Sequence, residues 1–391
     1  MEKYISRTII IAVILCSVCF LTYKFYGVTN VEDTSTKNIK QNNDMLSMMI
    51  ETSAGSGKYE MTTSSSWPTE DYVFNSELSK CENGSTLSWD DANKKVVFEG
   101  NNIDKCYVYF DVYSPPKVLS DVCNGGETLL SCIIYLSNKS ESTLTNIFYH
   151  DSTLANGAED NSYRYAGAST DVKNYICLGS SKESCPDESL YRIIGVFGDN
   201  NHGIKNQQLV KVIKNTTIGD LAWHTSQNND WSNASLNTIL NSTFITEKLF
   251  GIQDKVVEVF WRVSGQDNSA VTAKTFYTAE ITNTTKTHAA KIGLMYASDY
   301  GFATTSDYWT KKVSVYNSEA REKDWLYFES IDWLLSPTSG SSFGAWRIYD
   351  GGRVGWDYVD NTYAVRPSFY LNQSVQYISG SGTLSDPIRI N

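Results

Sequence analysis

The chain has 391 residues, a net charge of −11 and a sequence pI near 5.0. It offers no run of Lys and Arg that could neutralise a phosphate backbone, so composition and charge argue against a nucleic-acid-binding protein. Hydrophobic residues make up 41% of the sequence, which is enough for one large or several smaller domains.

An apolar segment at residues 8–23 lies between Arg7 and Lys24. As a helix it would span about 24 Å, and the long side chains of Arg7 and Lys24 can bridge the remainder of a hydrocarbon core of ~30 Å. A cleaved signal peptide is the alternative, although small residues of a cleavage site do not follow the segment. We therefore predict a transmembrane signal anchor at 1–24, single-pass in the cell membrane, with the C-terminal bulk extracytoplasmic.

The polar segment at 25–66 is rich in Ser, Thr and Asn and is predicted to be a flexible stalk. Strand-like runs separated by turn residues then indicate a small β module at 67–116, which ends in the stiff linker Ser114-Pro115-Pro116. The strand-like runs of the module lie at 72–74, 86–89, 95–100 and 105–113.

Residues 117–189 are expected to form a lead-in, with a helix at 126–136 followed by a β-meander that continues into the next domain. A second helix is predicted at 232–249 from its apolar spacing, with Ser232 or Asn233 as its N-cap. Further strands complete a C-terminal domain at 190–391, and these are predicted at 255–263, 275–282, 291–303 and 367–371.

The turn Asp350-Gly351-Gly352 stands between two alternating runs and predicts a β-hairpin with a three-residue loop. In that register Ile348 faces Val354 and Trp346 faces Trp356, which makes one face apolar. Core packing of the two tryptophans is favoured, and exposure on a binding surface is the alternative. Upstream, the Gly- and Ser-rich residues 340–344 are interpreted as a flexible loop.

Six cysteines follow the apolar segment and fall into sequential pairs without the CxxC spacing of a zinc site. An exported chain favours disulfide bonds over free thiols. We therefore predict three disulfides, Cys81–Cys106, Cys123–Cys132 and Cys177–Cys185, as in an extracellular protein.

The second half of the chain resembles an uncharacterised family of secreted or surface bacterial domains of Firmicutes type. That family is distantly similar to the sulfatase-modifying-factor and C-type-lectin-like fold. The resemblance covers roughly residues 190–391, and it is specific only as a set of motifs. The matching residues are Trp231, Ser235 (shifted from its usual place), Leu240, Asn241, Trp333-Leu334-Leu335-Ser336-Pro337 and Arg366-Pro367.

The resemblance implies an irregular α+β domain with antiparallel sheets and long loops, used for binding and more rarely for catalysis. The catalytic members bind copper through cysteines, and this chain has no cysteine after Cys185. Formylglycine-generating chemistry is therefore disfavoured, and no cofactor is expected. The oxygen-rich loops at Asp199, Asn201 and Asp230 are weak candidate ligands for calcium.

The aromatic and charged residues of the hairpin region are the candidate ligand-binding residues, because sugar-binding and protein-binding surfaces use Trp, Tyr and Arg. They are Trp346, Arg347, Asp350, Arg353, Trp356, Asp357 and Arg366. The favoured function is non-catalytic binding of a surface glycan or protein. The alternatives are a structural envelope protein and a glycan hydrolase, the latter with its carboxylates among Asp299, Asp307, Asp332, Asp350 and Asp357.

Overall fold

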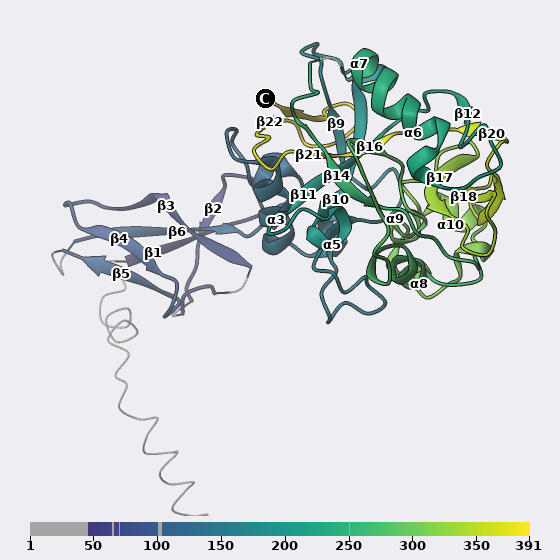
Figure 1. Cartoon of the computed structure of the whole chain (residues 1–391). Helices are drawn as coiled ribbons and strands as arrows, with labels where there is room; N and C mark the ends of the chain where they lie inside the picture. Colours follow the sequence, from purple (N-terminus) through teal and green to yellow (C-terminus); the bar gives the residue numbers. More distant parts are fainter. Residues whose placement is uncertain (1–45, 65, 70, 101–103, 250) are drawn as a thin grey trace, which may run out of the picture. The chain divides into compact units, whose positions relative to one another are not determined.

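The computed structural model describes residues 46–391 except 65, 70, 101–103 and 250 (Figure 1). The predicted anchor at 1–24 and the first part of the stalk lie outside the described residues. The chain divides into two compact units at the predicted linker, the first ending at Ser114 and the second running from Pro115 to Asn391. Within the described part of the chain, no helix has the length and apolarity needed to cross a membrane.

The smaller unit is a β module built on a four-stranded sheet with the strand order β2-β1-β6-β3. A hairpin of β4 and β5 packs with this sheet around Met48, Val96, Val108 and Phe110. The strands are β1 (Leu46–Glu51), β2 (Tyr59–Met61), β3 (Tyr72–Cys81), β4 (Thr86–Asp90), β5 (Lys95–Glu99) and β6 (Cys106–Val112).

The predicted stalk at 25–66 was wrong over its last part, because β1 and β2 belong to the module. Strand β1 pairs in parallel with β6, which buries Met48. The buried carboxylate of Glu51 accepts hydrogen bonds from the backbone N–H groups of Gly57 (2.9 Å) and Val112 (3.0 Å) and so fixes the end of β1. The sequence of β1 has no alternating apolar pattern that would predict a strand. The strand is stabilised by pairing with β6, which lies 60 residues away in the sequence.

The larger unit is of the predicted α+β class, with mainly antiparallel sheets. In the largest, every pairing except that of β23 with β9 is antiparallel. This ten-stranded sheet contains β7 (Ile147–Tyr149), β8 (Tyr163–Tyr165), β9 (Tyr175–Cys177), β10 (Leu190–Phe197), β11 (Leu209–Lys214), β13 (Val256–Val257), β16 (Ile292–Gly293), β21 (Ser368–Leu371), β22 (Tyr377–Ser379) and β23 (Ile388–Ile390).

A five-stranded sheet lies beside the large sheet, at the right edge of the unit in Figure 1. Its order is β12-β20-β17-β18-β19, so β19 is an edge strand. Its strands are β12 (Asp220–Ala222), β17 (Asp332–Pro337), β18 (Gly344–Ile348), β19 (Val354–Tyr358) and β20 (Thr362–Ala364). A separate ribbon pairs β14 (Val259–Arg262) with β15 (Thr287–Ala290).

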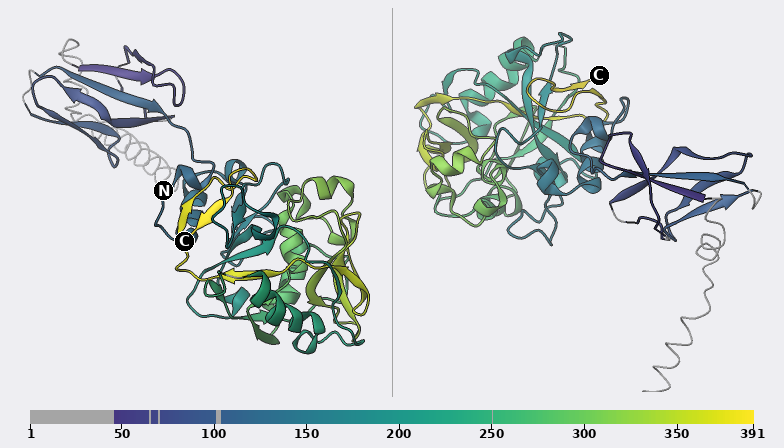
Figure 2. Two further views of the ribbon diagram at one scale, coloured as in Figure 1. Left: turned by 90° about the horizontal axis from the view of Figure 1, so that it is seen from above. Right: turned by 180° about the vertical axis from the view of Figure 1, so that it is seen from behind.

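Short helices cover the sheets, and Figure 2 shows α3 beside the C-terminal strands. The helices are α3 (Leu129–Lys139), α4 (Ser142–Thr145), α5 (Asp199–His202), α6 (Ser235–Ile239), α7 (Ile245–Lys248), α8 (Ala273–Tyr277), α9 (Ala297–Ala303) and α10 (Ser318–Glu322). Two π-helical turns, η4 (Leu240–Phe244) and η5 (Thr278–Thr282), continue α6 and α8. Single 3₁₀ turns are η1 (Leu119–Asp121), η2 (Asp187–Ser189), η3 (Trp231–Asn233), η6 (Ser306–Tyr308) and η7 (Val313–Val315).

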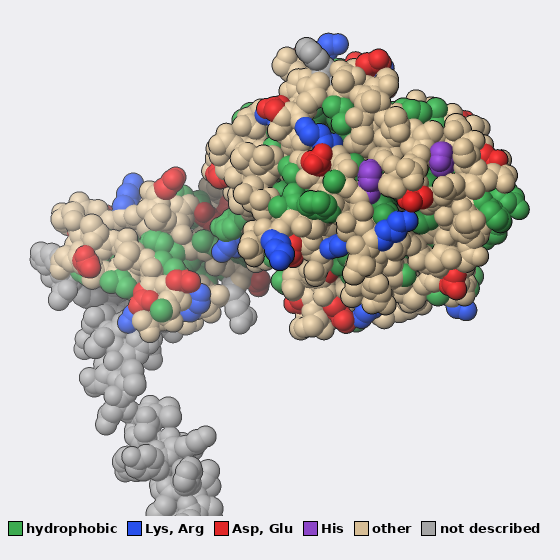
Figure 3. Space-filling model, in the orientation of Figure 1, with side chains coloured by type: hydrophobic (Ala, Val, Ile, Leu, Met, Phe, Trp, Pro, Cys, Tyr) green, Lys and Arg blue, Asp and Glu red, His purple; other side chains and the backbone are tan. Residues whose placement is uncertain are grey.

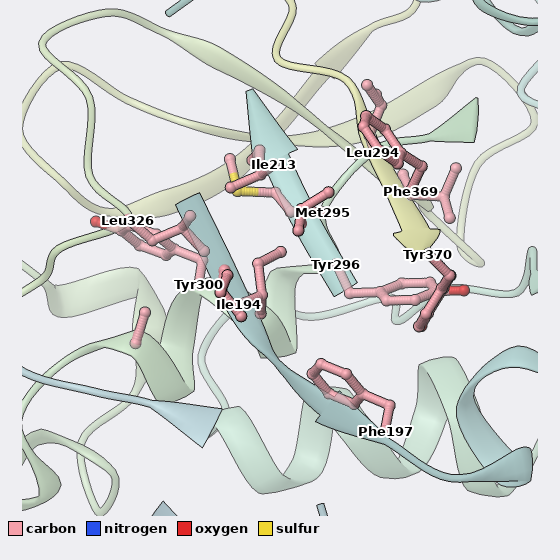
Figure 4. Packing of buried hydrophobic residues seen from close by; sticks show 14 of the residues in the cluster. Ile194, Phe197, Ile213, Leu294, Met295, Tyr296, Tyr300, Leu326, Phe369 and Tyr370 are labelled. Carbon is pink, nitrogen blue, oxygen red and sulfur yellow. The ribbon is translucent and has the colours of Figure 1, made fainter. Parts of the chain in front are cut away.

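The boundary predicted at residue 190 does not separate two structural units. Strands β8 and β9, from the predicted lead-in, pair with β10 in the same sheet. The core is continuous across this point, and Figure 4 shows part of it around β10 and β11. Residues 117–189 therefore supply one side of the larger domain.

The segment 275–282 is helical, so the strand predicted there was wrong. The buried residues of α8 and η5 follow the three- and four-residue spacing of a helix face, and they are Ala273, Phe276, Tyr277, Glu280 and Ile281. The β-branched threonines suggested a strand, but burial of this face in the core outweighs their propensity. Similarly, the predicted strand 291–303 is extended only at β16 and then becomes α9.

The helices predicted near 126–136 and 232–249 are confirmed as α3 and as the α6–η4–α7 segment. The predicted caps of the latter were wrong. Asp230 instead caps the preceding turn η3, and Ala234 stands before α6. All three predicted disulfides are confirmed, one in the smaller unit and two in the larger.

The buried imidazole of His202 is expected to make the protein less stable in acid. Its Nε2 lies 3.2 Å from the Phe197 carbonyl oxygen and its Nδ1 accepts from the Ile204 N–H, so the neutral ring satisfies both groups. Burial lowers the pKa of His202 from 6.5 to about 4. Because the unfolded chain binds this proton at higher pH, the stability contribution is present above 6.5 and lost as pH falls toward 4, by about 3 kcal/mol.

The variant His202→Gln tests this contribution, because glutamine can donate and accept without titrating. The measurement is the free energy of unfolding from pH 7 to pH 4 by denaturant titration. The difference between wild type and variant should shrink as pH falls. A difference that stays constant over this range would contradict the assignment.

Candidate functional site: an exposed aromatic cluster on the β18–β19 hairpin

The β18–β19 hairpin has the register predicted from the sequence. Trp346 pairs with Trp356 and Ile348 with Val354. The backbone N–H of Tyr349 bonds to the carbonyl of Arg353 at 2.9 Å, which closes a loop of three residues. Gly352 in this loop has a φ of 88°, a conformation that glycine adopts without strain. The three-residue loop is therefore confirmed.

The two paired tryptophans occupy different environments. Trp346 is buried, packs edge-on against Phe276 at 5.3 Å and donates to the Gln266 carbonyl. Trp356 is 42% exposed and lies on β19, the edge strand of its sheet. The core interpretation thus holds for Trp346 and fails for Trp356.

Trp356 belongs to an exposed aromatic cluster, which we define as Phe343, Trp356 and Tyr358. Their exposed fractions are 36%, 42% and 45%. The Phe343 and Tyr358 rings are stacked at 5.5 Å, and the Trp356 and Tyr358 rings meet at 82°. Figure 3 shows hydrophobic side chains gathered at the edge of the unit where the five-stranded sheet lies. The cluster is an apolar surface in which the Trp356 ring is nearly perpendicular to the Tyr358 ring.

The loop before β18 is held in place, in contrast to the flexible loop expected at 340–344. The side-chain amide of Asn229 donates to the carbonyls of Thr338 (2.9 Å), Ser341 (2.7 Å) and Gly344 (2.9 Å). The Trp356 ring packs across Gly344, where a Cβ would lie only 2.9 Å from it. The aromatic cluster is therefore preorganised by Asn229 and by the glycine beneath the tryptophan.

The opposite face of the hairpin carries a stack of Arg and Tyr side chains. The Arg347 guanidinium lies 3.7 Å from the Tyr349 ring and 4.3 Å from the Tyr363 ring, and Arg353 covers Tyr349 at 3.8 Å. Arg347 also pairs with Asp357 at 2.7 Å. This arrangement uses Arg347 to hold the two strands together and leaves Arg353 exposed.

The carboxylate of Asp357 is likewise engaged within the hairpin. Partial burial raises its pKa, but hydrogen bonds from the Tyr363 hydroxyl and the Tyr358 N–H, together with the charge of Arg347, produce a net lowering. The ionised form is thus stabilised by groups of the protein itself. Asp357 is best described as a support for the edge strand.

The remaining predicted ligand-binding residues do not share one surface. Arg366 is buried and binds Asp332 and the Leu326 carbonyl, so its assignment to a binding face was wrong. Asp350 is exposed at the hairpin turn, where its carbonyl oxygen accepts from Arg321. Of the seven predicted residues, Trp356, Arg353 and Asp350 are exposed. The sequence reasoning missed Phe343 and Tyr358, although Tyr358 continues the alternation of the hairpin.

The weak calcium candidates take part in separate interactions. The Asn201 amide donates to Asp160 at 3.0 Å, and Asp230 accepts from the Ser232 N–H and faces Lys286 at 3.4 Å. Asp199 begins the short helix α5. Across residues 46–391, excluding the gaps, no group of three or more His, Cys, Asp or Glu is arranged to hold a metal ion.

Two of the carboxylates considered for hydrolysis are buried in ion pairs. Asp299 contacts Lys211 at 2.5 Å, and Asp332 contacts Arg366 at 2.7 Å. Asp307 is exposed and lies 3.6 Å from Lys323. Each of these three carboxylates therefore has a cationic partner in the described structure.

The residues that carry the family resemblance form the scaffold of the larger unit. Trp231 is fully buried against Trp223. The Asn241 side chain accepts from the N–H groups of Lys291 and Ile292 and donates to the Ile292 carbonyl, which attaches β16 to the π-helical turn η4. The Ser336 hydroxyl donates to Glu280. The motif residues therefore stabilise the fold of the larger unit, and their contacts do not identify a ligand.

An open hollow of about 710 Å³ lies elsewhere on the larger unit, beside the Cys177–Cys185 loop. The side chains that line it include both positively and negatively charged residues. Its Arg389 donates hydrogen bonds to the carbonyls of Ser180 and Glu183. No predicted ligand-binding residue lines it. The aromatic cluster is therefore the stronger candidate site.

Comparison of the chain with protein-family models, with curated proteins and with solved structures finds no match. The exposed side chains of the hairpin and the chemistry that they offer are accordingly the features that point to a function. Exposure and a fixed neighbouring loop coincide at the aromatic cluster.

Proposed function

We propose that the chain is a membrane-anchored, extracytoplasmic bacterial surface protein that binds a glycan without catalysis. The larger unit would be a C-type-lectin-like domain, and the aromatic cluster would be its binding surface. Three disulfides fit an extracellular protein, which supports the proposed location. The anchor would be the apolar segment at 8–23.

The exposure of Trp356 beside Tyr358 is the observation that carries the proposal. An exposed aromatic ring offers a flat apolar face, against which the C–H-rich face of a pyranose can pack. The second ring, at 82° to the first, would form a side wall for the same sugar. Asp360, two residues after Tyr358, is exposed and accepts a hydrogen bond from the exposed side chain of Gln227. These groups can bind sugar hydroxyls.

A glycan fits this surface better than a protein partner does. A stable protein interface buries about 800 Å² on each side, whereas the cluster consists of three partly exposed rings. Binding also costs less when the surface is already ordered, and the Asn229 contacts hold the neighbouring loop in place. A rigid aromatic surface of this size suits one or two sugar rings.

The test is a glycan array probed with the full chain, followed by titration of the best ligand. We expect Trp356→Ala to weaken binding at least about tenfold, equivalent to ~1.4 kcal/mol, because the stacking face is lost. The matched control is Phe260→Ala, which removes a ring of similar exposure (47%) from β14. Equal binding by the Trp356 variant, or an array without any specific ligand, would refute the proposal.

A further inference from the structure

A lysine and an aspartate are in direct contact within the core of the larger unit. Lys211, on β11, places its Nζ 2.5 Å from Oδ2 of Asp299, in the first turn of α9. Their side chains are 1% and 3% exposed. The other carboxylate oxygen of Asp299 lies 3.6 Å from the Arg164 guanidinium. An amine and a carboxyl group are thus held together without access to bulk water.

Aromatic rings enclose the Lys211 amine. Its Nζ lies between 4.4 and 5.7 Å from the ring centres of Phe197, Trp261, Tyr296 and Tyr370, and Figure 4 shows Phe197, Tyr296 and Tyr370 in this part of the core. Burial lowers the pKa of Lys211, although the charge of Asp299 opposes the shift. Desolvation therefore makes the neutral amine, the nucleophilic form, easier to reach than it is in water.

A buried carboxyl group stands at the same turn. Glu280, on η5, accepts from the backbone N–H groups of Ala297 (3.0 Å) and Ser298 (3.1 Å), the two residues before Asp299. Burial raises the pKa of Glu280 to about 7. Such a group can accept or release a proton near neutral pH, and it is bonded to the turn that begins α9, where Asp299 lies.

We propose that Lys211 and Asp299 form an intramolecular isopeptide bond. The bond between Nζ of Lys211 and Cγ of Asp299 forms, and one C–O bond of the Asp299 carboxyl group breaks. Nζ loses two protons to the departing oxygen, which leaves as water, and Glu280 carries protons between them. An ammonium and a carboxylate become an amide and water, so charge balances and no oxidant, reductant or further reactant is required.

The energetics of the core favour this product. A buried ion pair carries a large desolvation penalty, whereas an amide is neutral. The condensation removes one positive and one negative charge and leaves the Arg164–Asp160 pair, at 2.8 Å, electrically balanced. The bond would join residues 88 positions apart. It is independent of glycan binding and would add a covalent link that reducing agents do not cleave.

The primary test is the intact mass of the wild-type full chain. After reduction of the disulfides, we expect the mass to fall short of the sequence mass by one water. A protease digest should contain one branched fragment that joins the peptides of Lys211 and Asp299. An intact mass equal to that of the reduced sequence would overturn the proposal, whatever the outcome of the glycan measurements.

Variants distinguish formation of the Lys211–Asp299 bond from mere packing of the two side chains. Asp299→Asn keeps the shape of the side chain and should lose ammonia in place of water, whereas Lys211→Met should show no loss and migrate more slowly on a reducing denaturing gel. Glu280→Gln should slow the condensation at least tenfold. The control is Lys274→Met, since Lys274 contacts Glu159 at 2.6 Å at the exposed surface, and this variant should keep the mass deficit. Persistence of the deficit in Lys211→Met would contradict the assignment of the bond.

Discussion

Replacing Trp346 with alanine is expected to lower the free energy of unfolding of the larger unit by about 3–5 kcal/mol, the usual cost of truncating a fully buried tryptophan. Trp346 is 1% exposed, packs against Phe276 and satisfies the Gln266 carbonyl through its Nε1–H. Alanine would leave a cavity between the hairpin and α8 and would remove the hydrogen bond. Chemical denaturation followed by intrinsic fluorescence measures the loss.

The paired residue supplies the control. Trp356→Ala acts on the same face of the same hairpin, but its side chain is 42% exposed. We expect it to cost about 1 kcal/mol or less, since little packing is lost at an exposed edge. Similar losses for the two variants would mean that Trp356 is part of the core, and the proposed binding surface would then be wrong.

Replacing Arg366 with alanine is expected to destabilise the larger unit by about 3–5 kcal/mol, because it leaves the buried Asp332 carboxylate without its counter-charge. Arg366 donates to Asp332 at 2.7 Å and to the Leu326 carbonyl. Burial already raises the pKa of Asp332, and the charge of Arg366 opposes this shift. Without the arginine the pKa should rise further, so the measured loss should grow with pH above the ordinary range of a carboxyl group.

The double variant Arg366→Met with Asp332→Leu distinguishes an uncompensated charge from lost packing. It should recover much of the stability, because a buried apolar pair can replace a buried ion pair at little net cost. Arg353→Ala is the matched surface control, and it should change stability by about 0.5 kcal/mol or less. Failure of the double variant to recover would show that the hydrogen bond to Leu326 dominates instead.

Local patterns predicted most of the strands and the hairpin correctly. The alternation around Asp350-Gly351-Gly352 was sufficient to place Trp346 opposite Trp356, since register in a tight hairpin depends on residues close in sequence. The sequential cysteine pairs were also informative, because each disulfide joins two cysteines that are neighbours in the order of cysteines along the chain. All three disulfides predicted from this order are present in the folded structure.

Patterns that depend on distant partners were misinterpreted. Strand β1 requires β6, and the helical segment around Tyr277 requires the core that receives its apolar face. The role of Asn229 is a similar case, because its three carbonyl partners come from residues 338–344. Nothing in the local sequence distinguishes an asparagine that anchors a remote loop from one in an ordinary turn.

By itself the sequence determined the hairpin register and the pairing of the cysteines, because both are encoded by spacing along the chain. Only the tertiary structure decided which aromatic and charged side chains are exposed. Trp346 and Trp356 have the same alternation, and Arg353 and Arg366 have the same chemistry, yet in each pair one is buried and the other exposed. Exposure depends on which element packs against a strand, and that neighbour is set by contacts far apart in the sequence.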